Sequence, residues 1–228
     1  MYLILEQKTL LTKIANKLTT NQRIFFAEII GTFIVIVLAT GSVVIDARLN
    51  GILGIPFFAF APFIGVALGV YIFGKISMAH FNPAVTLGFL ITRHITKVQL
   101  FYYFTAEILG ALLASLFVKF AIGSEANLGA NIPNYAFPIP VIIGVEVAAS
   151  ALLMSVIYVF VYTRGLRGFS SIAIGGIVGL DIFFSVYIWC FNESCSLLGS
   201  SACLWSFEQF VALLVGHIYR YINSCLNV

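Results

Sequence analysis

The sequence predicts an all-α integral membrane protein with six spanning segments, and its composition, length and charge distribution support this fold class. Hydrophobic residues make up 61% of the chain and charged residues only 9%, with a mean hydropathy of +1.06. These values lie far outside the range of soluble domains. The 228 residues accommodate about six spans of roughly 20 residues each, with short loops between them. We therefore expect the lipid bilayer, and no nucleic acid, as a partner of this chain.

Six apolar segments account for most of the chain. The first follows a basic leader, is too long for the apolar part of a signal peptide and has no small-residue cleavage site behind it. We therefore expect it to be retained as a span. The predicted spans are residues 24–45, 53–73, 98–122, 138–162, 171–188 and 207–222.

The distribution of Lys and Arg predicts the orientation of the chain, because positively charged loops stay on the cytoplasmic side. The leader, the segment 75–97, the loop 164–167 and the end of the last span near Arg220 all carry basic residues. The loop 123–137 carries Glu125 and neither Lys nor Arg, as an outer loop would. These features predict a multi-pass protein of the cell membrane with both termini in the cytoplasm.

The segment 78–88, MAHFNPAVTLG, lies between the second and third spans and is too short to cross a bilayer. Asn82 can cap a helix, Pro83 suits the first helical position, and Ala84 can continue the helix. The segment therefore predicts a re-entrant half-helix. Such a half-helix would start in the middle of the bilayer, where irregular backbone is tolerated only if protein buries it or a water-filled cavity lies beside it. We therefore expect a pore or a binding site at this point. The alternative is an ordinary Asn-Pro turn at a helix start.

The residues HFNPAVTLG closely resemble the first signature loop of the aquaporin, or major intrinsic protein, family. Three other segments resemble its first, third and fifth helices: AEIIGTF at 27–33, FTAEILGALLASL at 104–116 and GLDIFF at 179–184. The resemblance implies two inverted halves, residues 24–122 and 138–228, each with three spans and a half-helix. It also implies a homotetrameric passive channel for water and for small neutral solutes, without cofactor or metal.

The two halves share polar and small residues at corresponding positions. Glu28 in the first span corresponds to Glu146 in the fourth, and each lies inside an apolar segment where a carboxylate needs a partner or a cavity. The resemblance implies that both accept hydrogen bonds from the backbone of the half-helix loops, whereas snorkelling to the interface is the alternative. Glycines spaced by four also predict close helix contacts; they are Gly65, Gly69, Gly175 and Gly179.

The repeat predicts a second Asn-Pro-Ala near residue 200, but the chain has WCFNESCS at residues 189–196. All four cysteines and both tryptophans follow residue 188. We interpret this tail as a frameshift, because permitted codons for WCFNESCS, read one base later, encode Gly-Ala-Ser-Met-Asn-Pro-Ala-Arg. The alternative is a divergent second motif, with Glu193 at the pore centre and Cys195 at the position of the filter arginine. The residues of that motif are Asn192, Glu193, Ser194 and Cys195.

The resemblance implies a mechanism in which helix N-termini and Asn side chains disfavour cations and donate hydrogen bonds to a passing oxygen. Alignment on the signature places Pro62 and Ile182 near the selectivity filter. We interpret His80 as a buried neutral histidine bonded to the loop backbone, with a gate as the alternative.

Two other interpretations of the chain remain open: a glycerol or small-polyol facilitator, and a non-conducting structural homologue that lacks the second motif. A proton-coupled transporter has few candidate relay residues, which are Glu28, Glu107, Glu146 and Asp181. Their helix-packing positions argue against such a relay. No nucleophile, acid-base pair or metal cluster suggests an enzyme.

Overall fold

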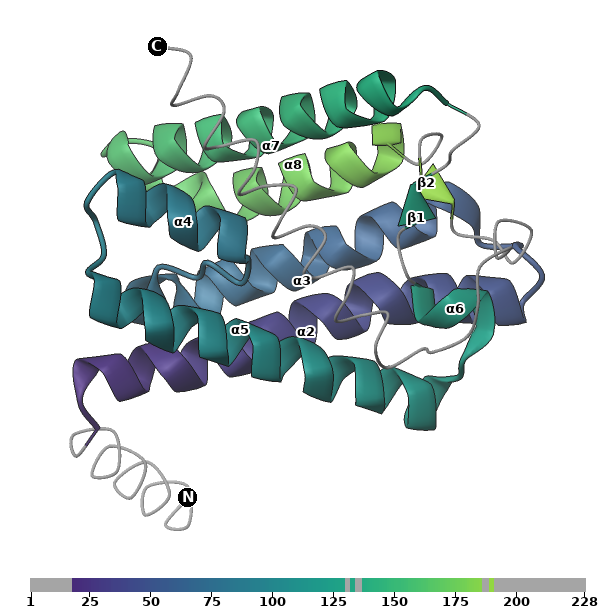
Figure 1. Cartoon of the computed structure of the whole chain (residues 1–228), viewed down its shortest axis with the longest axis horizontal. Coiled ribbons are helices and arrows are strands. Elements are labelled where there is room, and N and C mark those ends of the chain that lie inside the picture. Colours follow the sequence, from purple (N-terminus) through teal and green to yellow (C-terminus); the bar gives the residue numbers. More distant parts are fainter. Residues whose placement is uncertain (1–17, 130–131, 134–136, 186–188, 191–228) are drawn as a thin grey trace.

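The computed structural model describes residues 18–129, 132–133, 137–185 and 189–190, and Figure 1 shows their arrangement as a bundle of long helices. The helices and strands are α2 (Thr20–Arg48), α3 (Gly54–Ser77), α4 (Pro83–Ile91), α5 (Lys97–Phe117), η1 (Val118–Ile122), α6 (Glu125–Gly129), α7 (Ile139–Tyr162), η2 (Arg167–Phe169) and α8 (Ser170–Ser185), with β1 (Ile132–Pro133) and β2 (Trp189–Cys190). The two short strands pair antiparallel.

Five helices in the described part of the chain are long and apolar enough to cross a membrane. Their bounds are Thr20–Arg48, Gly54–Ser77, Lys97–Ile122, Pro140–Tyr162 and Arg167–Phe184. They correspond to the first five predicted spans. The sixth predicted span, residues 207–222, lies outside the described residues.

Local sequence explains where several of these helices begin and end. Thr19 and Gln22 form a capping box at the start of α2, and Thr96 and Gln99 form another at the start of α5. Helix α3 runs past the predicted end at residue 73, because the chain leaves the helix only at Met78, with a φ of 62°. The long apolar stem of a Lys in its last turn allows the helix to extend this far towards the interface.

Close approach between helices depends on glycines at the contacts. A Cβ on Gly175 of α8 would lie 2.6 Å from the carbonyl oxygen of Phe63 in α3, and one on Gly179 would lie 3.1 Å from that of Ala59. These contacts confirm the predicted small-residue packing for α8 against α3. Gly110 of α5 faces the backbone of α2 in the same way.

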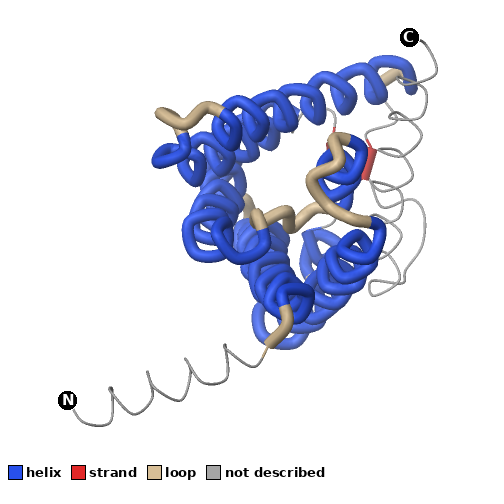
Figure 2. Tube along the Cα trace, turned by 90° about the vertical axis from the view of Figure 1, so that its left-hand side faces the viewer, coloured by secondary structure: helices blue, strands red, loops and turns tan. Residues whose placement is uncertain are grey.

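One end of the bundle, here called the basic end, carries most of the described cations. They are Arg23, Lys75, Arg93, Lys97, Arg164 and Arg167. Helices α2 and α5 start there and α3, α4 and α7 finish there, on the left of Figure 1. Figure 2 views the molecule from this end and shows loop segments inside the surrounding helices.

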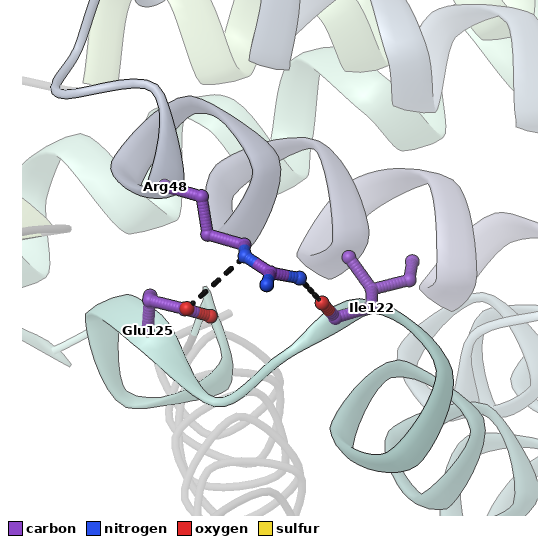
Figure 3. A network of polar contacts seen from close by, with 3 residues as sticks. All are labelled: Arg48, Ile122 and Glu125. Atoms are coloured by element: carbon purple, nitrogen blue, oxygen red, sulfur yellow. Dashed lines mark hydrogen bonds and ion pairs between the residues drawn. The ribbon is translucent and has the colours of Figure 1, made fainter.

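At the opposite end, Arg48 ties the end of α2 to the segment after α5 (Figure 3). Its Nε lies 3.2 Å from Glu125 Oε1, and its guanidinium also donates to the carbonyl oxygen of Ile122. The side chains of Arg48 and Glu125 are 53% and 38% exposed, so solvent screens their attraction. Asp46 closes the neighbouring turn by accepting from the backbone amides of Leu53 and Gly54.

Candidate functional site

The half-helix predicted from the sequence is present as α4. The preceding loop contains three non-glycine residues with positive φ, Met78, Ala79 and Phe81, at 62°, 52° and 50°. Asn82 then returns to extended backbone and its Oδ1 accepts from the amide of Ala84 at 2.8 Å, with proline at the next position. The nine residues of α4 form a helix of roughly 14 Å, too short to span a bilayer.

Glu28 of α2 anchors this strained loop. Its carboxylate is fully buried and accepts from Ser77 Oγ at 2.5 Å, from the His80 amide at 3.1 Å and from the Phe81 amide at 2.7 Å. The loop amides thus have partners that neither helix nor sheet provides, which offsets the cost of the unusual backbone. These are the hydrogen bonds that the family resemblance implied for Glu28. For Glu146, only the backbone in α7 is described.

The ring of Phe81 fixes the loop sterically. It lies against Gly31 of α2 and Gly69 of α3, where an added Cβ would approach its atoms to 1.9 Å and 2.5 Å respectively. Any larger residue at either glycine would displace the ring. Gly69 was expected to allow a helix–helix contact, but its small size accommodates this aromatic wedge instead.

His80 is buried and lies between two aromatic rings. Its ring stacks on Phe89 at 4.6 Å and on Tyr103 at 4.1 Å. Thr86 Oγ1 donates to Glu107 Oε1 at 2.7 Å, so the 2.8 Å contact between His80 Nδ1 and Thr86 Oγ1 requires the histidine to donate.

The second nitrogen of that histidine, Nε2, is buried without a partner among the described residues. A proton there would be an unpaired buried charge, so we infer a neutral ring. The structure confirms that His80 is buried, as the sequence predicted, and its neutral state stays a prediction that the unpaired Nε2 supports. The predicted hydrogen-bond partner of His80 was wrong, because the imidazole bonds to the side chain of Thr86 and not to the loop backbone.

The other end of α4 is held by α7. Tyr158 Oη donates to the carbonyl oxygen of Gly88 at 3.1 Å, and Thr92 Oγ1 donates to the same carbonyl at 2.9 Å. His94, just beyond α4, contacts both Thr92 and Tyr162 of α7. The half-helix is thus positioned by α2 and α5 at its start and by α7 at its end.

A cavity of about 980 Å³ leads from the basic end to Asn82. Asn82 Oδ1 is occupied by the cap of α4, which leaves the amide Nδ2 hydrogens for a molecule in the cavity. The N-terminus of α4, equivalent to roughly half a positive charge, points towards the same place. Apart from a few polar groups the walls are apolar; they include Val35, Val66, Val70, Val85, Phe89, Leu153, Ile157, Phe160, Val161, Ile174 and Val178.

The residues predicted for the selectivity filter do not line this cavity. Pro62 is fully buried within α3. Ile182 of α8 packs against an apolar cluster at the opposite end of the bundle that contains Phe58 of α3 and Ala126 of α6. The residues of the altered second motif, 192–195, lie outside the described residues, so their predicted role stays a prediction.

Sequence reasoning missed Thr86 and overlooked the part that Glu107 plays in the site. Glu107 was considered only as a member of a proton relay, but it is fully buried on α5 and holds α4 through Thr86. Burial of a carboxyl group on an apolar helix was the available signal. Its partner is 21 residues away along the chain and could not be deduced from spacing.

Comparison with known proteins agrees with this geometry. A family model described as Major intrinsic protein matches residues 15–219. The chain is 38% identical over 109 residues to "Glycerol uptake facilitator protein-like 6" of Lactiplantibacillus plantarum, covering 46% of this chain and 48% of that protein. It is 32% identical over 161 residues to "Aquaporin NIP1-1" of Zea mays, covering 70% and 56%.

Among solved structures, the chain resembles an aquaglyceroporin from Plasmodium falciparum, with a TM-score of 0.64 and 20% identity over 87% of this chain and 93% of that one. At this identity the likeness concerns the fold. The chain spans about half the length of the curated relatives named above. Since the family model covers most of the sequence, and the structure contains the capped half-helix beside a cavity, this chain belongs to the major intrinsic protein family of membrane channels.

Proposed function

We propose that the chain forms a passive transmembrane channel for water that also admits small neutral solutes and excludes ions and protons. The observation that supports this function most directly is the position of Asn82, which caps α4 at the inner end of the 980 Å³ cavity. Its free amide hydrogens can replace part of the hydration of a passing oxygen. The apolar walls hold nothing else strongly, so the molecule can leave again.

Ion exclusion follows from the same geometry. A cation at Asn82 meets two amide hydrogens and the positive end of the α4 dipole, and no described acidic side chain lines the cavity to offset them. Water and polyols carry no net charge and avoid this penalty. A second half-helix, if residues 189–228 supply one, would add the same barrier from the other side.

A glycerol or small-polyol facilitator is the second candidate. The 38% identical relative is named a glycerol uptake facilitator protein-like protein, and its aligned region includes nearly half of this chain. Water and glycerol flow therefore have to be measured in parallel. The third candidate is a non-conducting homologue, which the altered sequence after residue 188 favours.

We further propose that the basic end of the bundle faces the cytoplasm, which also places both termini there, and that the chain works in the cell membrane as a homotetramer with one pore per subunit. The orientation is supported by six of the eight described Lys and Arg residues lying at that end. The proposal of a tetramer is supported only by membership of the family.

Stopped-flow light scattering on proteoliposomes tests the channel function. Asn82→Asp keeps the oxygen that caps α4 but removes both amide donors and adds a negative charge. We expect slower water flow and a higher leak of monovalent cations. The matched control is Asn50→Asp, in an exposed turn of the opposite end. Unchanged water flow and cation exclusion in Asn82→Asp would contradict the proposed role of this side chain.

The tail requires a separate comparison. Under the frameshift interpretation, a version of the chain whose codons after residue 188 are read in the shifted frame contains a second Asn-Pro-Ala. We expect it to conduct faster than the chain as it stands, because both half-helices are then present. Equal rapid flow in the two versions would refute the claim that the tail limits conduction. Resequencing the gene tests the frameshift itself, since an uninterrupted frame through codon 189 excludes it.

A further inference from the structure

The mouth of the cavity carries two cations from different parts of the fold. Lys75 is in the last turn of α3 and Arg167 starts η2, and both line the cavity that leads to Asn82. Ser170 and Ser171, at the start of α8, add two hydroxyl groups to the same wall. The mouth therefore combines positive charge with hydrogen-bond donors.

Arg167 is held in place by its own loop. Its Nε donates to the carbonyl oxygen of Val161 at 2.9 Å, and Ser170 Oγ donates to the carbonyl oxygen of Arg167 at 2.9 Å. The first bond orients the guanidinium and leaves its two terminal amino groups available. No ion pair joins Arg167 or Lys75 to an acidic residue in the described part of the chain. Both positive charges are thus uncompensated there.

The preference of cytoplasmic loops for basic residues explains why these cations lie at the basic end, but not why they line the cavity. Arg93, Lys97 and Arg164 lie at the same end and are not among the residues that line it. No Asp or Glu of the described residues lines it either. An anion that approaches from this side is therefore attracted to the mouth in particular.

We propose that this mouth binds a phosphate group and that the bound group narrows the entrance to the cavity. A guanidinium presents paired N–H donors that match two phosphate oxygens, a lysine adds a point charge, and the hydroxyl of Ser171, unlike that of Ser170, has a proton left to donate to a third oxygen. The phosphate can come from free inorganic phosphate or from the head group of an anionic phospholipid. The effect on flow rests on the proposed channel function, whereas the binding does not.

Direct binding is the primary test. Inorganic phosphate is titrated into the purified full chain in neutral detergent and followed by isothermal titration calorimetry. We expect Lys75→Gln and Arg167→Gln each to weaken binding about fivefold, and added salt to weaken it further. The matched controls, Arg93→Gln and Lys97→Gln, remove a charge from the same end without changing the cavity wall, so they should bind as the unaltered chain does.

Water flow identifies the source of the phosphate. Phosphatidylcholine vesicles with inorganic phosphate on both sides are compared with phosphatidylcholine vesicles that include phosphatidylglycerol. Flow slower than in plain phosphatidylcholine vesicles points to free phosphate if it occurs in the first kind of vesicle, and to a lipid head group if it occurs in the second. Since Arg167→Gln weakens binding about fivefold, it should reduce either effect.

Three outcomes would overturn the proposal. The first is no binding of inorganic phosphate together with no effect of phosphatidylglycerol on flow. The second is an equal loss in the control variants, which would indicate a general surface effect. The third is unaltered flow in a conducting channel under both conditions. A chain that binds phosphate at Lys75 and Arg167 but never conducts refutes only the channel function.

Discussion

Replacing Glu28 by Gln should loosen the loop before α4, and the size of the effect can be worked out from three hydrogen bonds. Ser77 Oγ and the amide of His80 both donate to Oε1, and the amide of Phe81 donates to Oε2. Glutamine has one oxygen, so in either orientation of the amide at least one donor faces an NH₂ group. A buried donor without a partner costs about 1–3 kcal/mol. Glu28→Ala leaves all three unpaired and adds a cavity, so it should cost about 3 kcal/mol or more.

The assay is the free energy of unfolding of the full chain in mixed micelles, combined with water flow per folded molecule in vesicles. Ser115→Ala is the matched control. Ser115 is also a buried polar residue of a spanning helix, but its Oγ bonds only to a carbonyl of its own helix, that of Ala111. Its removal leaves no buried donor without a partner, so Ser115→Ala should destabilise the chain less than Glu28→Gln does. The reasoning is refuted if Glu28→Gln is as stable and as permeable as the unaltered chain.

Other substitutions test separate contacts. Gly175→Ala should destabilise by about 1–3 kcal/mol, because the new Cβ would lie 2.6 Å from a carbonyl oxygen of α3. Gly176→Ala meets no atom within 4 Å, and should stabilise α8 by up to about 1 kcal/mol. Asn82→Ala should cost about 1 kcal/mol through the lost cap and should also slow water flow. Arg48→Gln should cost more than Glu125→Gln, because the exposed ion pair contributes roughly 0–1 kcal/mol, whereas Arg48 also bonds a carbonyl.

The same unfolding measurement checks all of these substitutions. Equal effects at Gly175 and Gly176 would show that α8 does not pack on α3 as described. A fully stable Asn82→Ala variant would mean that α4 does not depend on its cap. If Glu125→Gln lowers the free energy of unfolding as much as Arg48→Gln does, the hydrogen bond from Arg48 to the carbonyl of Ile122 contributes nothing to stability.

Helix boundaries were predictable because they depend on neighbours in the sequence. The cap by Asn82 needs only the next few residues, and the spans need only a run of apolar side chains longer than the bilayer core. The end of α3 was misjudged by a few residues, since the lysine in its last turn suggested an earlier interface. The partners of Glu28 could be anticipated only through the family resemblance, as they lie about 50 residues away.

The contacts around His80 show where sequence reasoning stops. The stacking of the His80 ring on Phe89 and on Tyr103, and its hydrogen bond to Thr86, depend on where α4 and α5 come together. The same holds for Phe81, whose ring fits because Gly31 and Gly69 face each other across it from two helices. No periodicity in the chain marks such pairs.

The sequence by itself determined three features: that this chain is a membrane protein, at which residues its helices begin, and that a half-helix starts at Asn82. These features follow from the free energy of transfer of local segments and from hydrogen bonds between near neighbours. Only the tertiary structure decided that Glu107 and Tyr158 also hold the half-helix, and which two of the basic residues at the basic end line the cavity. Those contacts join residues far apart in the chain, and packing in three dimensions selects them.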